Sequence, residues 1–170
     1  AKLWMSEQVG WVRCRPAQTH AGHADAILFF GSSDRKLHAV RAVDGAPAWD
    51  SPYSADGEVY GNPVISHDDT VVYITSVHNW KVHAVNTASG TAKWTTQTTT
   101  HPADNWIYGA PVLSPDNSFL FVSDYKGYLF KIRTSDGQIL FQNAAGSGDP
   151  LINAAGTILY ATSKTYSHWS

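Results

Sequence analysis

Histidine and cysteine are the residues of this chain with the most chemical potential. The sequence holds eight histidines and one cysteine. His20 and His23 have a spacing that could bind a metal ion, but two neutral imidazoles without a third ligand make a weak site. Cys14 lies between two arginines, and flanking cations could lower the pKa of its thiol. The alternation around it equally fits a strand in which Val12 and Cys14 face inward.

Two further histidines share one position in a repeat. His38 and His83 occupy the same place in neighbouring units, and Phe130 stands there in the next unit. Because phenylalanine can only pack, the position is interpreted as a packing slot. The sequence has no Gly-x-Ser-x-Gly motif, and Gly146-Ser-Gly148 lacks the Lys-Ser/Thr that would follow in a phosphate-binding loop. Neither nucleophilic catalysis nor phosphate binding is predicted.

The acidic residues stand in segments that the sequence predicts to be turns. Aspartate is favoured in turns because its side chain hydrogen-bonds to the backbone. A calcium ion takes 6–8 oxygen ligands, and no cluster of carboxylates or amides offers them. We therefore predict no catalytic residue, no bound metal and no cofactor in this segment. The turn residues are Asp34, Asp44, Asp116, Asp124 and Asp136.

The elements that would position these residues come from a repeat. One aromatic residue recurs at intervals of 45, 45 and 47 positions, and a glycine precedes each of the last three by four residues. A fixed period in the forties indicates stacked units that share a core. The aromatics are Trp4, Trp49, Trp94 and Phe141, and the glycines are Gly45, Gly90 and Gly137.

One unit can be divided into four strands. Tyr60–Ile65 is entered through Gly and Pro, Val71–Thr75 is β-branched and aromatic, and Lys81–Asn86 alternates polar and apolar residues. A glycine turn with an expected left-handed backbone then leads into Thr91–Trp94. Four strands joined by tight turns and then repeated are typical of β-propeller blades. We predict an all-β propeller of four-stranded antiparallel blades with almost no helix.

The recurring sequence motif Ala-x-x-x-x-(Ser/Asp)-Gly-x-x-x-Trp, hereafter called the phrase, follows an apolar strand and a Gly/Ala-x-Pro-Val entry. It resembles the pyrroloquinoline-quinone (PQQ)-like propeller repeat over about residues 26–142. The sequence departs from the family where Phe141 replaces the tryptophan, and where Arg41, Asn86 and Arg133 stand in place of a favoured aspartate. The resemblance implies that the aromatic of each phrase docks between neighbouring blades.

Residues 1–170 are interpreted as one propeller segment of about three to four blades, with partial blades at both ends. Ala1–Trp4 resembles the tail of a phrase, and Tyr166–Trp169 stops where a third strand is expected. A ring needs roughly 4–8 blades, so we expect this chain to be a segment of a longer propeller.

The function predicted is a non-catalytic module for protein binding or scaffolding within a larger protein or assembly. Trp80 and Trp106 are the candidate interaction surface, because exposed aromatics at loops commonly carry binding energy. One alternative, implied by the resemblance, is part of a PQQ-dependent quinoprotein oxidoreductase that uses PQQ and calcium bound outside this segment. A single cysteine cannot form the adjacent-cysteine disulfide of many such enzymes. A second alternative is a secreted or cell-surface carbohydrate-binding propeller.

The composition of the chain limits the classes of binding partner and the location that are expected for it. A net charge of −2 gives no basic footprint for nucleic acid, and the apolar runs are too short for a membrane span. A charged fraction of only 15%, with Ser, Thr, Asn and Gln supplying the polar surface, favours an extracytoplasmic or secreted location. The expected channel-lining strands, Tyr60–Ile65 and Tyr108–Leu113, are mostly apolar and carry no carboxylate.

Overall fold

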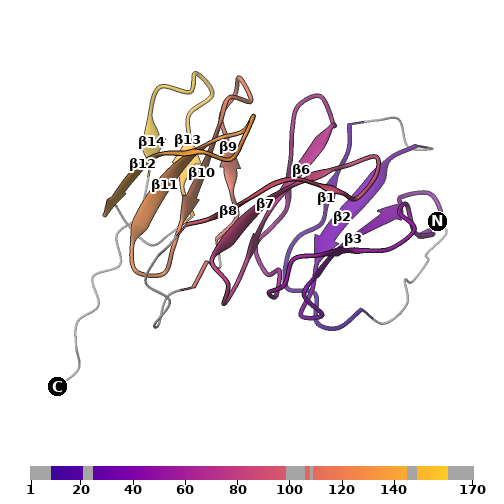
Figure 1. The fold of residues 1–170 in the computed structure, drawn as a ribbon. Helices are drawn as coiled ribbons and strands as arrows, with labels where there is room; N and C mark the ends of the chain where they lie inside the picture. The colour runs from indigo at the N-terminus through magenta and orange to yellow at the C-terminus, as the bar shows by residue number, and fades with distance from the viewer. Residues whose placement is uncertain (1–8, 21–24, 99–105, 108, 145–148, 161–170) are drawn as a thin grey trace.

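The computed structural model describes residues 9–20, 25–98, 106–107, 109–144 and 149–160, and every regular element in them is a β-strand (Figure 1). Four antiparallel sheets follow one another, each with its strands in sequence order. The first sheet consists of β1 (Ala17–Gln18), β2 (Ile27–Gly31), β3 (Lys36–Arg41) and β4 (Tyr53–Ser54). The second consists of β5 (Val64–Ile65), β6 (Val71–Ser76), β7 (Lys81–Asn86) and β8 (Ala92–Gln97). The third consists of β9 (Val112–Leu113), β10 (Phe119–Ser123), β11 (Tyr128–Arg133) and β12 (Ile139–Ala144). The fourth has two strands, β13 (Leu151–Ile152) and β14 (Leu159–Tyr160).

The predicted four-stranded blades are confirmed, but their first strands are shorter than predicted. The strand expected over Tyr60–Ile65 is only β5, and the strand expected over Tyr108–Leu113 is only β9. Pro63 and Pro111 directly precede these short strands. Proline has no backbone N–H to donate to a ladder, so regular pairing begins after it.

The second sheet is covered on both faces. Alternate residues of β6 point in opposite directions, and Val72 and Ile74 pack with Phe29 of the first sheet. Tyr73 belongs to a second cluster that includes Phe130 of the third sheet. This double burial explains why β6 is apolar and buried along its whole length.

Each turn glycine has the positive φ that its position predicts, at 74° for Gly45, 70° for Gly90 and 77° for Gly137. Two of them also permit a close approach between sheets. A Cβ at Gly90 would lie 2.7 Å from the Trp49 ring, and one at Gly137 would lie 2.7 Å from the Trp94 ring. Glycine is therefore required here both by backbone conformation and by space.

Two phrase aromatics bridge neighbouring sheets in the same way. Trp49 is 7% exposed and donates its indole N–H to the Thr87 carbonyl of the second sheet at 2.7 Å. Trp94 is half-buried and donates to the Thr134 carbonyl of the third sheet at 2.7 Å. Each indole thus packs on the turn glycine of the next sheet and satisfies its polar N–H there.

The expectation that Phe141 is buried between blades is wrong for the described structure, because its side chain is 49% exposed. The groups that receive Trp94 come from the turn after a third strand. The described part of the last sheet ends at Tyr160, after its second strand, and offers no such turn. Trp4 lies outside the described residues.

The first sheet departs from the predicted phrase. Its fourth strand does not open at Trp49, which lies in a loop, but at β4. Before it, the phrase makes one isolated bridge between Val40 and Pro47. Two hydrogen bonds make this bridge, from the Arg41 N–H to the Ala46 carbonyl and from the Ala48 N–H to the Ala39 carbonyl. Tyr53 is the first residue of β4.

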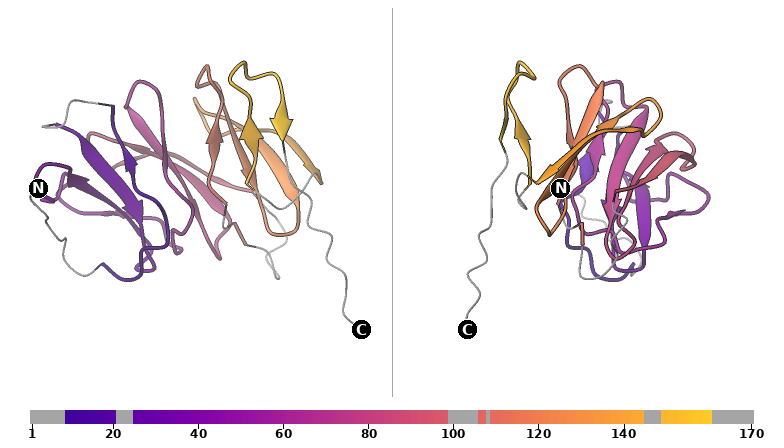
Figure 2. Two further views of the ribbon diagram at one scale, coloured as in Figure 1. Left: turned by 180° about the vertical axis from the view of Figure 1, so that it is seen from behind. Right: turned by 60° about the vertical axis from the view of Figure 1, so that its left-hand side comes forward.

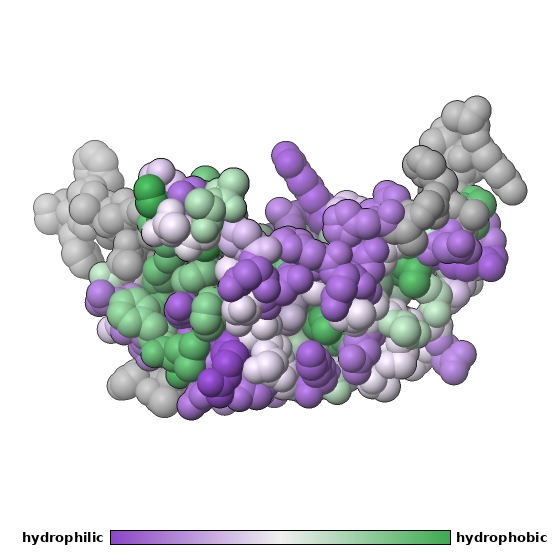
Figure 3. Space-filling view, turned by 90° about the horizontal axis from the view of Figure 1, so that it is seen from above, coloured by the Kyte–Doolittle hydropathy of each residue, from purple (hydrophilic) through white to green (hydrophobic). Residues whose placement is uncertain are grey.

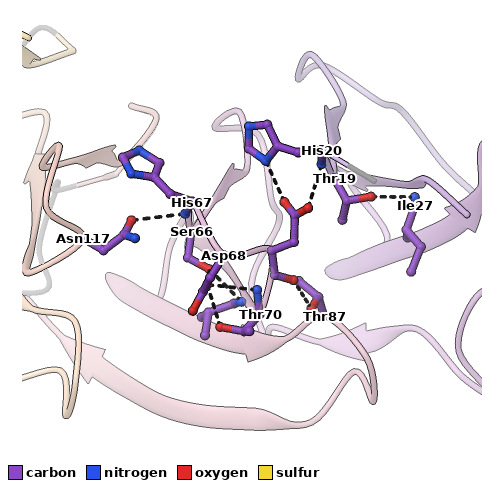
Figure 4. A network of polar contacts seen from close by, with 11 residues as sticks. Thr19, His20, Ile27, Ser66, His67, Asp68, Thr70, Thr87 and Asn117 are labelled. Carbon is purple, nitrogen blue, oxygen red and sulfur yellow. Dashed lines mark hydrogen bonds and ion pairs between the residues drawn. The ribbon is translucent and has the colours of Figure 1, made fainter. Parts of the chain in front are cut away.

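The sheets are also joined at the turns between first and second strands (Figure 4). The backbone N–H of His20 donates to the Asp69 carboxylate at 2.8 Å, and the N–H of His67 donates to the Asn117 side chain at 3.2 Å. Asp69 and Asn117 both have positive φ, so each turn reaches back to the preceding one. The same contact thus occurs between the first and second sheets and between the second and third sheets.

The sheets form an open row, with the N-terminal sheet at one end and β13–β14 at the other (Figure 2). The short first strands lie side by side, β1 next to β5 and β9 next to β13. They correspond to the innermost strands of propeller blades, and the longer second and third strands carry the cores.

Candidate functional site

One end of each sheet is built from two connections that hydrogen-bond to each other. The loop after the second strand donates to the segment that enters the first strand: Ser33 N–H to the Trp11 carbonyl, Val77 to Glu58 and Tyr125 to Trp106. In an antiparallel sheet of this order, these two connections lie at the same end. We call the surface that they form the loop face.

Aromatic and cationic side chains gather on the loop face. The Arg13 guanidinium lies 5.0 Å from the Tyr60 ring centre and 5.4 Å from that of Trp11. These distances are in the range of cation–π contacts. Arg13 therefore joins the entries of the first and second sheets. Trp11 remains 70% exposed.

A second group of rings joins the second and third sheets. Trp106 lies 5.3 Å from the Tyr125 ring centre, and His78 approaches it edge-on at 6.2 Å. The His78 imidazole is 3.0 Å from the Glu58 carboxylate, which fixes its position. The six side chains, hereafter the aromatic row, are Trp11, Arg13, Tyr60, His78, Trp106 and Tyr125.

The two tryptophans expected to form an interaction surface are placed differently. Trp106 is a half-buried member of the aromatic row. Trp80 has a positive φ of 53° and packs, partly buried, against the second core cluster. Its carbonyl accepts the N–H of Thr98. Trp80 is thus tied mainly to the core, and Trp106 to the loop face.

Sequence reasoning missed Trp11, Arg13 and His78. A signal was present, because Trp11 and Trp106 each stand five residues before the proline that precedes a first strand. Aligning the repeats at these prolines would have placed both tryptophans on one face. The contacts of Arg13 and His78 join residues of different sheets and have no local pattern.

The packing slot predicted for two histidines is confirmed. His38 is 7% exposed and His83 only 1%, and Phe130 is fully buried. The His83 imidazole is hydrogen-bonded with the Tyr53 hydroxyl at 2.9 Å and with the Ser76 hydroxyl at 2.8 Å. Burial, with Lys81 nearby, lowers the pKa of His83 to about 4.

Cys14 is buried, and burial raises the pKa of its thiol despite the adjacent arginines. Its sulfur accepts the N–H of Gly31 at 3.2 Å. The environment therefore opposes the thiolate that a reactive cysteine needs. The strand with two inward residues is not formed: the segment lies before β1, and Val12 is exposed.

The turn aspartates have the backbone role expected of them. Asp116 and Asp136 have pKa values lowered to about 2, chiefly by hydrogen bonds from Ser114 and Arg133 respectively. They remain ionised acceptors rather than proton donors at neutral pH. The five aspartates, Asp34, Asp44, Asp116, Asp124 and Asp136, accept the N–H groups of Lys36, Ala46, Ser118, Tyr128 and Gln138.

A carboxylate stands at the entry of the last inner strand, outside the two strands for which none was predicted. Asp149 stands before Pro150 at the entry of β13, the place held by Asn62 in the second sheet, and lies against Gly109. Asn62 already accepts the Arg15 N–H at 2.7 Å.

Among the described residues, no group of three or more His, Cys, Asp or Glu side chains could hold a metal ion. His20 instead pairs with Asp69 at 2.8 Å, and His23 lies outside the described residues. Two oxygen-bearing side chains at the inner entries do not match the 6–8 ligands of calcium. The described residues therefore do not fit a calcium-bound quinone.

Comparison with known proteins identifies the family to which this fold belongs. The PQQ_2 family model, described as "Outer membrane protein assembly factor BamB", matches residues 1–112. The chain belongs to the PQQ-like β-propeller repeat family. No curated protein sequence matches it. No helix of the described residues is long and apolar enough to cross a membrane.

Solved propeller structures resemble the chain in fold. BamB from Moraxella catarrhalis has a TM-score of 0.68 at 16% identity, over 85% of this chain and 45% of BamB. The computationally designed Ika8 protein has a TM-score of 0.64 at 12% identity, over 84% of this chain and 40% of that protein. Quinohemoprotein alcohol dehydrogenase from Comamonas testosteroni has a TM-score of 0.63 at 18% identity, over 83% of this chain and 22% of the dehydrogenase. The chain thus spans less than half the length of each.

Proposed function

We propose that this chain is a non-catalytic, protein-binding propeller module of a larger assembly, and that it binds through the aromatic row. The observation that carries the proposal is the cluster of the His78, Trp106 and Tyr125 rings on the same face as the Arg13–Tyr60 contact. Tryptophan, tyrosine and arginine are the residues that most often dominate binding energy at protein interfaces.

The family supports a role in assembly. Its model is described by the name of an outer membrane protein assembly factor, and a propeller in such a role acts through contacts with other proteins. An extracytoplasmic location, already favoured by the weakly charged composition, agrees with that role. We propose the same location for this chain.

The chemistry of the aromatic row suits an apolar polypeptide segment. Its rings offer apolar area at low entropic cost, because aromatic side chains have few rotatable bonds. The Glu58–His78 pair and Arg13 supply polar groups at the margin. With a net charge of −2, long-range charge attraction contributes little, so contact at the rings must supply the affinity.

The experiment measures binding of fluorescent peptides that copy β-strands of outer membrane proteins, using anisotropy. Trp106→Ala should weaken binding at least tenfold, equivalent to about 1.4 kcal/mol, because truncating a central aromatic removes a main contact. Lys93→Ala, an exposed change on β8, is the matched control and should leave the affinity unchanged. Binding of neutral oligosaccharides but of no peptide would contradict the proposal and favour the carbohydrate-binding alternative.

A further inference from the structure

The turn between β6 and β7 is one residue longer than its counterparts in the neighbouring sheets. The equivalent cross-strand pairs span six positions in the first and third sheets, Gly31–Leu37 and Ser123–Leu129, but seven in the second, Thr75–Val82. The longer turn has two residues with positive φ, His78 at 67° and Trp80 at 53°, whereas each of the other two has one. Positive φ is uncommon outside glycine, and residues in such conformations cluster at binding sites.

This turn is held against the segment that enters its own sheet. The Val77 N–H donates to the Glu58 carbonyl at 2.8 Å, and the Asn79 side-chain amide donates to the Ala55 carbonyl at 2.8 Å. Gly57 permits the close approach, because a Cβ at that position would lie 2.4 Å from the Val77 carbonyl oxygen. The longer turn therefore has a fixed course on the loop face.

The His78 imidazole joins a carboxylate to the rings of the aromatic row. Its Nε2 atom lies 3.0 Å from Oε2 of Glu58, and its ring meets the Trp106 ring at 86°. The His78 side chain is 55% exposed, whereas that of Glu58 is 25% exposed. Because His78 contacts Trp106, a segment that binds over the Trp106 ring also covers the pair of His78 and Glu58.

The charge of this pair depends on whether His78 is protonated. With a neutral imidazole the pair carries one negative charge, and with an imidazolium it carries no net charge. Removing a net charge from water is costly, whereas the attraction between opposite charges strengthens as the dielectric constant falls. An apolar segment that excludes water from the pair is therefore bound at a lower cost when His78 is protonated.

His78 is the group near this turn whose charge changes around neutral pH. Carboxyl, phenol and ammonium side chains ordinarily titrate outside the range from pH 5 to pH 8, and histidine titrates within it. His83 on β7 is buried, with a pKa lowered to about 4. Within the described part of the chain, the remaining charged or titratable residues of the entry segment, of β7 and of the turn after β10 are Asp56, Tyr60, Lys81, Asp124, Tyr125 and Lys126.

We propose that His78 is a proton-sensitive residue of the aromatic row, so that the row binds its partner segment more tightly as the pH falls from 8 to 5. This regulation rests on the proposed function, the binding of an apolar polypeptide segment at the row. Protonation of His78 cancels the charge of Glu58, and binding is coupled to the uptake of a proton.

The test is the affinity for the fluorescent strand peptides at pH 8 and pH 5, measured by anisotropy. The peptides carry no ionisable side chain and have blocked termini, so their own charge is constant. The wild-type affinity should be about fivefold higher at pH 5, the lower end of typical coupling between two sites. Circular dichroism checks that the chain and each variant are folded at both pH values.

Two variants separate the charge of the pair from its shape. His78→Asn removes the titrating ring, and asparagine tolerates positive φ, so the affinity should be equal at the two pH values. Glu58→Gln keeps a hydrogen-bonding partner for His78 but leaves the pair neutral at pH 8 and positive at pH 5. Its affinity should therefore fall with falling pH, the reverse of the wild type.

His67→Asn is the matched control. His67 is exposed in the turn between β5 and β6. That turn lies at the end of the molecule away from the loop face, uppermost in Figure 1, and the middle of this end is mainly hydrophilic (Figure 3). The control should keep the full pH response of the wild type.

The outcomes distinguish this regulation from the binding itself. Equal wild-type affinity at the two pH values, a full response in His78→Asn, or a response of wild-type sign in Glu58→Gln would each overturn the role of His78. The proposed function would then still stand if Trp106→Ala weakens binding. A wild-type chain that binds the peptides at neither pH would overturn the proposed function, and the regulation with it.

Discussion

One repeat position shows how a single side chain adapts to its sheet. His38 pairs with Asp34 at 2.8 Å and stacks on Phe30, whereas His83 lies between the Tyr53 and Ser76 hydroxyls. The third residue at this position, Phe130, is packed in an apolar cluster. The position always requires a flat, buried ring, and the local hydrogen-bond partners decide whether that ring is polar.

The pH dependence of stability should depend on His83. Its pKa is about 4 when folded and 6.5 as a model group, so protons bind preferentially to the unfolded chain between these values. The stability associated with neutral His83 is present above pH 6.5 and is lost as the pH falls toward 4, by up to about 1.4 kcal/mol per pH unit. Urea unfolding at pH 7 and pH 5 should show a smaller loss for His83→Phe than for the wild type.

Phe130 shows that phenylalanine fits this position, so the variant should fold, although it loses the hydrogen bonds of the imidazole and is less stable at pH 7. His83→Phe with the same pH response as the wild type would show that other groups titrate instead.

At the scale of elements, the phrase aromatic matters only where the next sheet receives it. Trp49→Ala should destabilise the fold by about 3–5 kcal/mol, because it empties a buried site and leaves the Thr87 carbonyl without its indole partner. Phe141→Ala should cost less than about 1 kcal/mol, because the ring is half exposed. Chemical denaturation of both variants gives the comparison, and equal losses would contradict the docking geometry.

At the scale of the whole molecule, the ties between turns hold neighbouring sheets together. Asp69 receives the His20 N–H and Asn117 receives the His67 N–H. Between the third sheet and the last sheet, the position of the donor is occupied by Pro115, which has no backbone N–H. The residue that faces it is Gly156, which has no side chain to accept a hydrogen bond. Donor and acceptor are thus lost together at the junction with the two-stranded last sheet.

Restoring this tie should stabilise the junction. Pro115→His with Gly156→Asn recreates the donor and acceptor, and asparagine tolerates the φ of 72° at that place. The double variant should be more stable than the sum of the single changes by about 0.5–1.5 kcal/mol. A double-mutant cycle in urea measures this coupling; additive changes would show that the turns do not meet.

The second and third strands of the blades, the turn glycines, the turn aspartates and the packing slot of His83 were predictable from the sequence. These features depend on local patterns repeated at a fixed interval, so each copy supports the interpretation of the others. The two bridging indoles were implied by the resemblance to the PQQ-like repeat, in which the phrase aromatic docks between neighbouring blades.

Other features that join different sheets became visible only once the sheets were packed together. The exposure of Phe141 depends on whether a later sheet offers a receiving turn, and the raised pKa of Cys14 depends on burial that outweighs its neighbours in sequence. The aromatic row requires Arg13 to reach Tyr60 across a sheet boundary. Such contacts depend on the rotation between sheets, which no local sequence pattern encodes.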